Sequence, residues 1–120
     1  MEPKQEHNRP VLVVYFFRSV AGNQPVRDWL LSLKHEDRKT IGEDIKTAQF
    51  GWPLGMPLIR KLETGIWEVR SNISQGIARV LFTVEDNTMA LLHGFLKKSQ
   101  RTPLSEINLA RRRLTNLRKV

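Results

Sequence analysis

Three side chains suited to phosphate chemistry lie in two neighbouring segments that have the pattern of β-strands, residues 66–71 and 77–84. Side chains alternate along a strand, so Glu68 and Arg70 share one face of the first segment. Pairing through the short turn between the segments brings Arg79 to the same face. Two arginines there repel each other unless an anion lies between them, and the guanidinium fork matches a phosphate group. A cross-strand salt bridge to Glu68 is the alternative interpretation.

A third predicted strand, residues 88–96, leads into a basic turn at Lys97 and Lys98. Its alternation places His93, Phe95 and Lys97 on one face, so the turn can aim two ammonium groups at one point. The alternative for His93 is a hydrogen-bonded core residue. Phe95 is expected to be partly in the core, with base stacking as its second role.

The positive charge of the chain is concentrated at its C-terminal end. The net charge is +8, and residues 97–120 alone carry eight basic side chains against the single acid Glu106. Such a field is typical of a protein that binds a phosphate backbone, although an anionic protein partner or a solvated helix face explains the same bias. The basic residues are Lys97, Lys98, Arg101, Arg111, Arg112, Arg113, Arg118 and Lys119.

The composition excludes several kinds of site. The chain has 120 residues, 40% hydrophobic and 27% charged, as in a single globular domain. It has no cysteine, which excludes disulfides, thiolate zinc sites and a cysteine nucleophile, and its histidines lack metal-ligand spacing. No apolar run approaches the roughly 20 residues of a membrane span. We therefore expect a cytoplasmic protein with a flexible lead-in over residues 1–10 and one domain over 11–120.

Periodicity predicts the elements that position these residues. Residues 11–17 form an apolar run typical of a buried strand. Residues 25–33 have the apolar stripe of an amphipathic helix, and a second helix follows to Gly51. Residues 51–58 have the composition of a loop.

A closing helix follows the basic turn, with Thr102 as its N-cap and Pro103 at its first position. The order β-α-α-β-β-β-α predicts an α+β domain, in which a helical hairpin and a C-terminal helix pack on a small, mainly antiparallel sheet. The apolar stripe of the closing helix comprises Leu104, Ile107, Ala110, Leu114 and Leu117.

Four motifs, in this order and at this spacing, resemble the HigB-like, phage-derived branch of the RelE/ParE toxin superfamily. They are KLETGIWEVR at 61–70, RVLF at 79–82, LLHGFLKK at 91–98 and TP at 102–103. The resemblance covers about 110 residues if the predicted helical pair is included. It implies a RelE-like fold, with the active face on the strands.

The resemblance also implies an activity. A protein of this kind is the toxin of a type II toxin–antitoxin system, a metal-independent endoribonuclease without a cofactor that cuts mRNA, usually on the ribosome. It inhibits translation until a cognate helix-turn-helix antitoxin silences it. The reaction is attack of a ribose 2′-hydroxyl on the adjacent phosphate, which gives a cyclic phosphate and a free 5′-hydroxyl.

On this resemblance, Arg70 and Arg79 would hold the phosphate, and Lys97 or Lys98 would orient it or neutralise its charge. Glu68 and His93 are the side chains near this face whose pKa values suit a general base and a general acid. RNA binding is assigned to five further residues: Lys61, Phe95, Arg101, Arg111 and Arg112.

The sequence departs from some RelE-type relatives in its closing helix, where they carry a catalytic tyrosine or a further arginine. Position 107 is Ile here, and the single tyrosine, Tyr15, lies in the first predicted strand. Two alternatives therefore remain. The ParE branch shares the fold and poisons DNA gyrase without cutting RNA, and a basic binding module would carry no chemistry at all.

Overall fold

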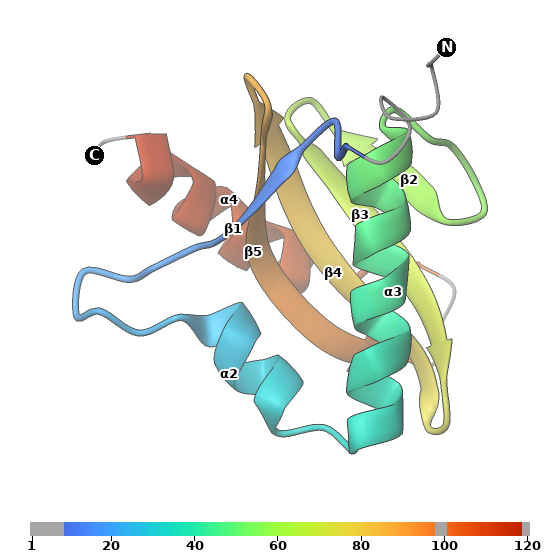
Figure 1. Ribbon diagram of the computed structural model, residues 1–120. Coiled ribbons are helices and arrows are strands. Elements are labelled where there is room, and N and C mark those ends of the chain that lie inside the picture. Colours follow the sequence, from blue (N-terminus) through green and yellow to red (C-terminus); the bar gives the residue numbers. More distant parts are fainter. Residues whose placement is uncertain (1–8, 98–100, 119–120) are drawn as a thin grey trace, which may run out of the picture.

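The computed structural model describes residues 9–97 and 101–118, so most of the expected lead-in over residues 1–10 lies outside the described residues (Figure 1). The chain forms strands and helices in the order β1 (Val13–Phe16), α2 (Pro25–Leu31), α3 (His35–Gly51), β2 (Ile59–Glu63), β3 (Ile66–Ile73), β4 (Gly76–Glu85), β5 (Thr88–Lys97) and α4 (Leu104–Arg118).

The strands make one sheet in the spatial order β1-β5-β4-β3-β2. Strand β1 runs parallel to β5, and the other neighbours are antiparallel. Helices α2 and α3 cover one face and α4 covers the other (Figure 1). This arrangement confirms the predicted α+β class, with its helical hairpin and C-terminal helix. No helix in the described parts of the chain is long and apolar enough to cross a membrane.

Three details differ from the prediction. Strand β2 was missed, because three of the five residues of Ile59–Glu63 are charged and the strand lies at the edge of the sheet, where apolar alternation is not needed. The first strand is the opposite edge and is not buried, since Val13 is 54% and Tyr15 42% exposed. In α4, Leu104 is 61% exposed, because the helix begins there and its core contacts start at Ile107.

The strand alternation divides the core into two layers. Val69, Val80 and Phe82 point toward the α3 side, where they pack with Ile41 and Ile45. The intervening residues point toward α4, where Ile66, Leu81 and Leu92 pack with Ala110 and Leu114. The faces predicted for the β3–β4 hairpin are therefore confirmed.

A β-bulge in β5 decides which layer its second half joins. Phe82 pairs with Leu91, but the preceding residue Leu81 pairs with His93, so Leu92 is an extra residue on β5. An unbroken ladder would place His93 opposite Val80, on the α3 side. The bulge turns His93 and the alternate residues after it toward α4, onto the face that carries Arg79.

Helix α2 packs so closely on β5 that one position of the strand must be glycine. A Cβ atom at Gly94 would lie 2.4 Å from Cε3 of Trp29. The glycine of the LLHGFLKK motif therefore has a packing role, which is to admit the Trp29 indole.

We expect Gly94→Ala to lower the free energy of unfolding by about 1–3 kcal/mol, because the added methyl overpacks against the Trp29 ring. Urea unfolding followed by circular dichroism measures the change. Gly42→Ala is the matched control: nothing lies within 4 Å of its Cβ position in α3, so it should be neutral or stabilise the helix. Equal stability of both variants would show that the Trp29–Gly94 contact is not tight.

Candidate functional site

The predicted phosphate-binding residues do lie together, on the α4 face of the sheet. Arg70 in β3 is directly opposite Arg79 in β4. Glu68, two residues before Arg70 and therefore on the same face, is opposite Leu81. The β4–β5 ladder adds Phe95 opposite Arg79 and His93 opposite Leu81.

A single hydroxyl links the carboxylate to one of the arginines. Thr102 Oγ1 donates to Glu68 Oε1 at 2.6 Å and accepts from Arg79 Nη1 at 2.9 Å. The side chains of Glu68 and Arg79 are fully buried, and Thr102 is 6% exposed. Because only Pro103 separates Thr102 from α4, this link fixes the start of the helix over β3 and β4. The hydroxyl that we predicted to cap the helix makes these two bonds to residues of the sheet, and α4 begins at Leu104, not at the predicted Pro103.

Glu68, Arg70, Arg79 and Thr102 form a cluster, and Arg70 is its most exposed member, with 18% of its side chain exposed. Its Nε lies 3.9 Å from Glu68 Oε2. That separation is too long for a hydrogen bond, and within the described part of the chain both atoms are buried without a hydrogen-bond partner. The cluster therefore holds an adjacent buried donor and acceptor that do not bond each other.

The cluster carries more positive than negative charge. Burial lowers the pKa of Arg79; the Glu68 carboxylate opposes this, while Arg70 and Arg60 lower it further. Arginine stays protonated in proteins, so three guanidinium groups surround one carboxylate. The excess charge favours an anion at the exposed edge of the cluster, beside Arg70.

Arg60 is the member of this group that our sequence analysis missed. It pairs with Glu68 across the β2–β3 ladder and so shares its face. Assigning residues 59–63 to a strand that pairs with β3 would have revealed it, because Arg60 and Glu68 then alternate onto the same side.

His93 lies under α4 in a network of its own. Its Nε2 is 2.6 Å from Glu106 Oε1, its Nδ1 is 3.4 Å from Arg113 Nη1, and its ring stacks on Phe95 at 5.3 Å. Burial lowers the pKa of His93, and the nearby Glu106 only partly offsets it. The neutral imidazole with its proton on Nε2 satisfies both contacts, since it donates to Glu106 and offers a lone pair to the Arg113 guanidinium.

The predicted lysine turn is described in part. Lys97 ends β5 opposite Ile77, one row beyond Arg79 and Phe95, on the same face. Lys98 lies outside the described residues.

Ion pairs use part of the basic charge of α4. Arg111 bonds Glu63 through two nitrogens, with Nε 2.9 Å from Oε2, and this bond lowers the pKa of Glu63. Arg118 Nε lies 2.6 Å from Glu85 Oε2. Arg113 donates to the carbonyl of Leu92 at 2.9 Å. Of the residues assigned to RNA binding, Arg101 and Arg112 are exposed, whereas Phe95 is buried.

Comparison with known proteins adds one finding. The family model described as phage-derived protein Gp49-like (DUF891) matches residues 28–115, most of the chain from α2 to α4. No curated protein matches the chain significantly.

We expect Thr102→Val to lower the free energy of unfolding by about 1–3 kcal/mol, because it removes the hydroxyl that both buried charges use. Thr102→Ser keeps the hydroxyl and should recover most of that loss. Thr47→Val is the matched control, since the Thr47 hydroxyl is exposed and bonds only its own helix. Chemical unfolding of the three variants tests this, and a fully stable Thr102→Val protein would contradict the bridging role.

His93 should make stability depend on pH. Its pKa in the folded state lies below the ordinary value of 6.5, so the unfolded chain binds the proton first as the pH falls. Stability should therefore decrease as the pH falls from about 7 through the lowered pKa, and the loss should level off below it. His93→Gln should flatten this part of the curve in urea unfolding, whereas replacing the exposed His35 should not. An unchanged slope in His93→Gln would mean that another group titrates.

Proposed function

Because the chain belongs to the phage-derived Gp49-like family, a toxin-like family, we propose that it is the toxin of a type II toxin–antitoxin system and cleaves mRNA as a metal-independent endoribonuclease. On this proposal it acts on the ribosome and stops translation. The supporting observation is the cluster on the α4 face, where the partly exposed Arg70 lies beside the buried Arg79–Thr102–Glu68 group.

In the proposed reaction the scissile phosphate binds at Arg70. The exposed fork of Arg70 contacts the phosphate oxygens, and the buried charge of Arg79 adds to the positive potential behind it. Lys97, on the same face, and the neighbouring Lys98 provide further positive charge for the phosphate or the strand that carries it.

The unpaired atoms of the cluster suit the attacking ribose hydroxyl. A hydroxyl is both donor and acceptor, so it can donate to Glu68 Oε2 while it accepts from Arg70 Nε. Glu68 would then take the 2′-hydroxyl proton as the oxygen attacks phosphorus, and the 5′-oxygen would leave with a proton from an acid. Since Glu68 is buried, Arg70 must turn outward to admit the hydroxyl.

We propose His93 as that acid. Its Nε2 carries the proton that Glu106 accepts, and its ring is 13% exposed. The acid form of His93 is the imidazolium, and because burial lowers the pKa of the ring, His93 must take up a proton from solvent before it can protonate the 5′-oxygen. The proton that Glu68 removes returns to solvent after the reaction, so each turnover leaves both groups as they began.

A toxin of this kind requires an antitoxin in the same cell. We propose a helix-turn-helix protein encoded by an adjacent gene, and co-expression with that gene should restore growth. This partner belongs to the proposal and does not bear on the chemistry of the cluster.

Expression of the chain without an antitoxin should stop growth and shorten reporter mRNA. We expect Arg70→Ala to reduce cleavage in single-turnover assays by roughly ten-fold or more, because charge-assisted phosphate contacts are lost. The cleavage rate of Arg70→Lys should lie between those of Arg70→Ala and the unmodified protein, because an ammonium group keeps the charge but cannot replace the guanidinium fork. The matched control is Arg27→Ala, an exposed arginine of α2, which should cleave normally.

Thermal unfolding of each variant separates loss of activity from loss of fold. Arg70 is a better probe than Arg79, because removal of Arg79 would leave the buried Glu68 carboxylate without its ion partner. A folded Arg70→Ala protein with full toxicity would assign the cluster to structure alone. If growth stops while mRNA stays intact and DNA breaks appear, the proposed ribonuclease function is wrong and the protein acts as a gyrase poison.

A further inference from the structure

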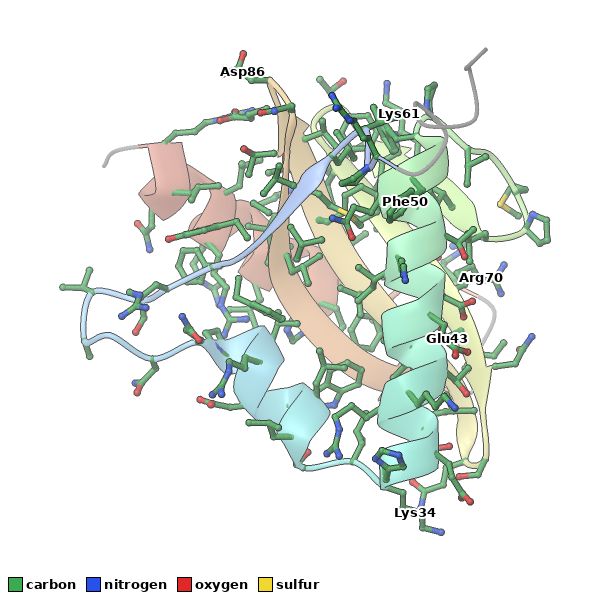
Figure 2. The ribbon with its side chains drawn as sticks, viewed as in Figure 1. Lys34, Glu43, Phe50, Lys61, Arg70 and Asp86 are labelled. Atoms are coloured by element: carbon green, nitrogen blue, oxygen red, sulfur yellow. The ribbon has the colours of Figure 1, made fainter. Side chains whose placement is uncertain are left out.

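A groove of about 630 Å³ follows the outer edge of the sheet, on the far side of Arg70 from β4. We call it the edge groove. One side of the groove is formed by strand β2 and the neighbouring part of β3. The other side is formed by the loop that leads into β2. Its walls include Leu54, Met56, Arg60, Lys61, Trp67 and Arg70. Figure 2 shows Lys61 and Arg70 at separate points along this side of the molecule.

The polar side of the edge groove is entirely cationic. Arg60 and Arg70 point toward the α4 face and Lys61 toward the α3 face, so the three charges follow the groove around the edge of the sheet. Within the described residues, the side chains of Arg60 and Lys61 have no salt bridge and no hydrogen bond. Of the described residues that line the groove, none is acidic. These charges are available to an anion.

The apolar side of the edge groove has a fixed aromatic wall. The Trp67 ring is held edge-on to Trp52 at 5.2 Å and stacked with Phe82 at 6.1 Å, and Lys61 Nζ lies 5.8 Å above it. The facing loop exposes Met56 to 62%, so its side chain is open to solvent within the groove that the Trp67 ring also lines. A fixed aromatic ring beside unpaired cations is the combination that binds single-stranded nucleic acid, in which bases stack and phosphates pair with charges.

The edge groove opens into the candidate catalytic cluster, because Arg70 belongs to both. A smaller depression of about 300 Å³ on the other side of Arg70 is less suited to RNA, since its walls include Asp44. A strand whose phosphate binds at Arg70 can therefore continue past Arg60 and Lys61 without meeting an acid.

We propose that the edge groove binds an unpaired nucleotide of the RNA substrate that flanks the scissile phosphate. Its base lies between Met56 and the Trp67 wall, and the phosphates on its two sides pair with Arg60 on one face of the sheet edge and with Lys61 on the other. This inference rests on the proposed ribonuclease function and adds a substrate-binding subsite outside the cluster.

The test is binding of the full chain to a fluorescent, 2′-O-methylated and therefore uncleavable RNA of about ten nucleotides, measured by anisotropy over a salt series. Arg60→Ala with Lys61→Ala should weaken binding at least ten-fold and reduce the salt slope by about one to one and a half units. Arg27→Ala with Lys39→Ala removes the same charge from exposed positions on α2 and α3, and should weaken binding less than about three-fold.

Replacing the bases by abasic nucleotides tests the stacking contact. The unmodified protein should bind the abasic oligomer roughly five-fold or more weakly than the parent RNA, because it loses a stacked base. In Met56→Ser the affinities for the parent RNA and the abasic oligomer should be closer to each other, because the base has lost one of its two contacts. This variant should keep its fold, since the Met56 side chain is mostly exposed.

Each outcome decides between the proposals. One outcome is that both double variants lose the same affinity for the probe while the unmodified protein binds it and cleaves unmethylated RNA. In that case the positive charge acts without a defined site, and only the edge groove is rejected. If the groove variant loses binding to polyglutamate but not to RNA, the groove binds an acidic protein segment. Should the unmodified chain bind no RNA even at low salt, the ribonuclease function and the edge groove both fail.

Discussion

One buried carboxylate determines how the two sides of this protein fit together. Glu68 is fully enclosed, and its charge is stabilised only because Thr102 bridges it to Arg79 and because Arg70 lies nearby. Removing such groups from water costs several kcal/mol per ion, so the arrangement persists only if all partners are in place. Since the partners come from β3, β4 and the residue before Pro103, the cluster also fixes where α4 begins on the sheet.

The position of α4 then decides how its charges are used. Once its start is fixed, Glu106 reaches His93, while Arg111 and Arg118 reach Glu63 and Glu85. Two of the basic side chains of α4 therefore form ion pairs that hold the helix on the sheet. Arg60 and Lys61, which have no ion pair among the described residues, lie instead at the β2 edge, beside the partly exposed Arg70. Part of the C-terminal excess of positive charge is therefore held in ion pairs within the fold.

Several features were predictable from residue order alone. Alternation in residues 66–84 placed Glu68, Arg70 and Arg79 on one face, because a hairpin with a short turn leaves one register that buries the apolar side chains. The class of fold and the closing helix also followed from periodicity and helix-start residues. Strand β2 did not, since an edge strand with charged residues has no pattern that differs from a loop.

The sequence by itself determined which residues alternate on each strand and which helices are amphipathic, because these depend on local periodicity. Only the tertiary structure decided that the β5 bulge turns His93 toward α4, and that Thr102 lies between Glu68 and Arg79. It also decided that Gly94 faces Trp29. These contacts join residues far apart in the chain, and their geometry depends on strand register and helix placement. Both are set by how the whole core packs, and no local pattern encodes that.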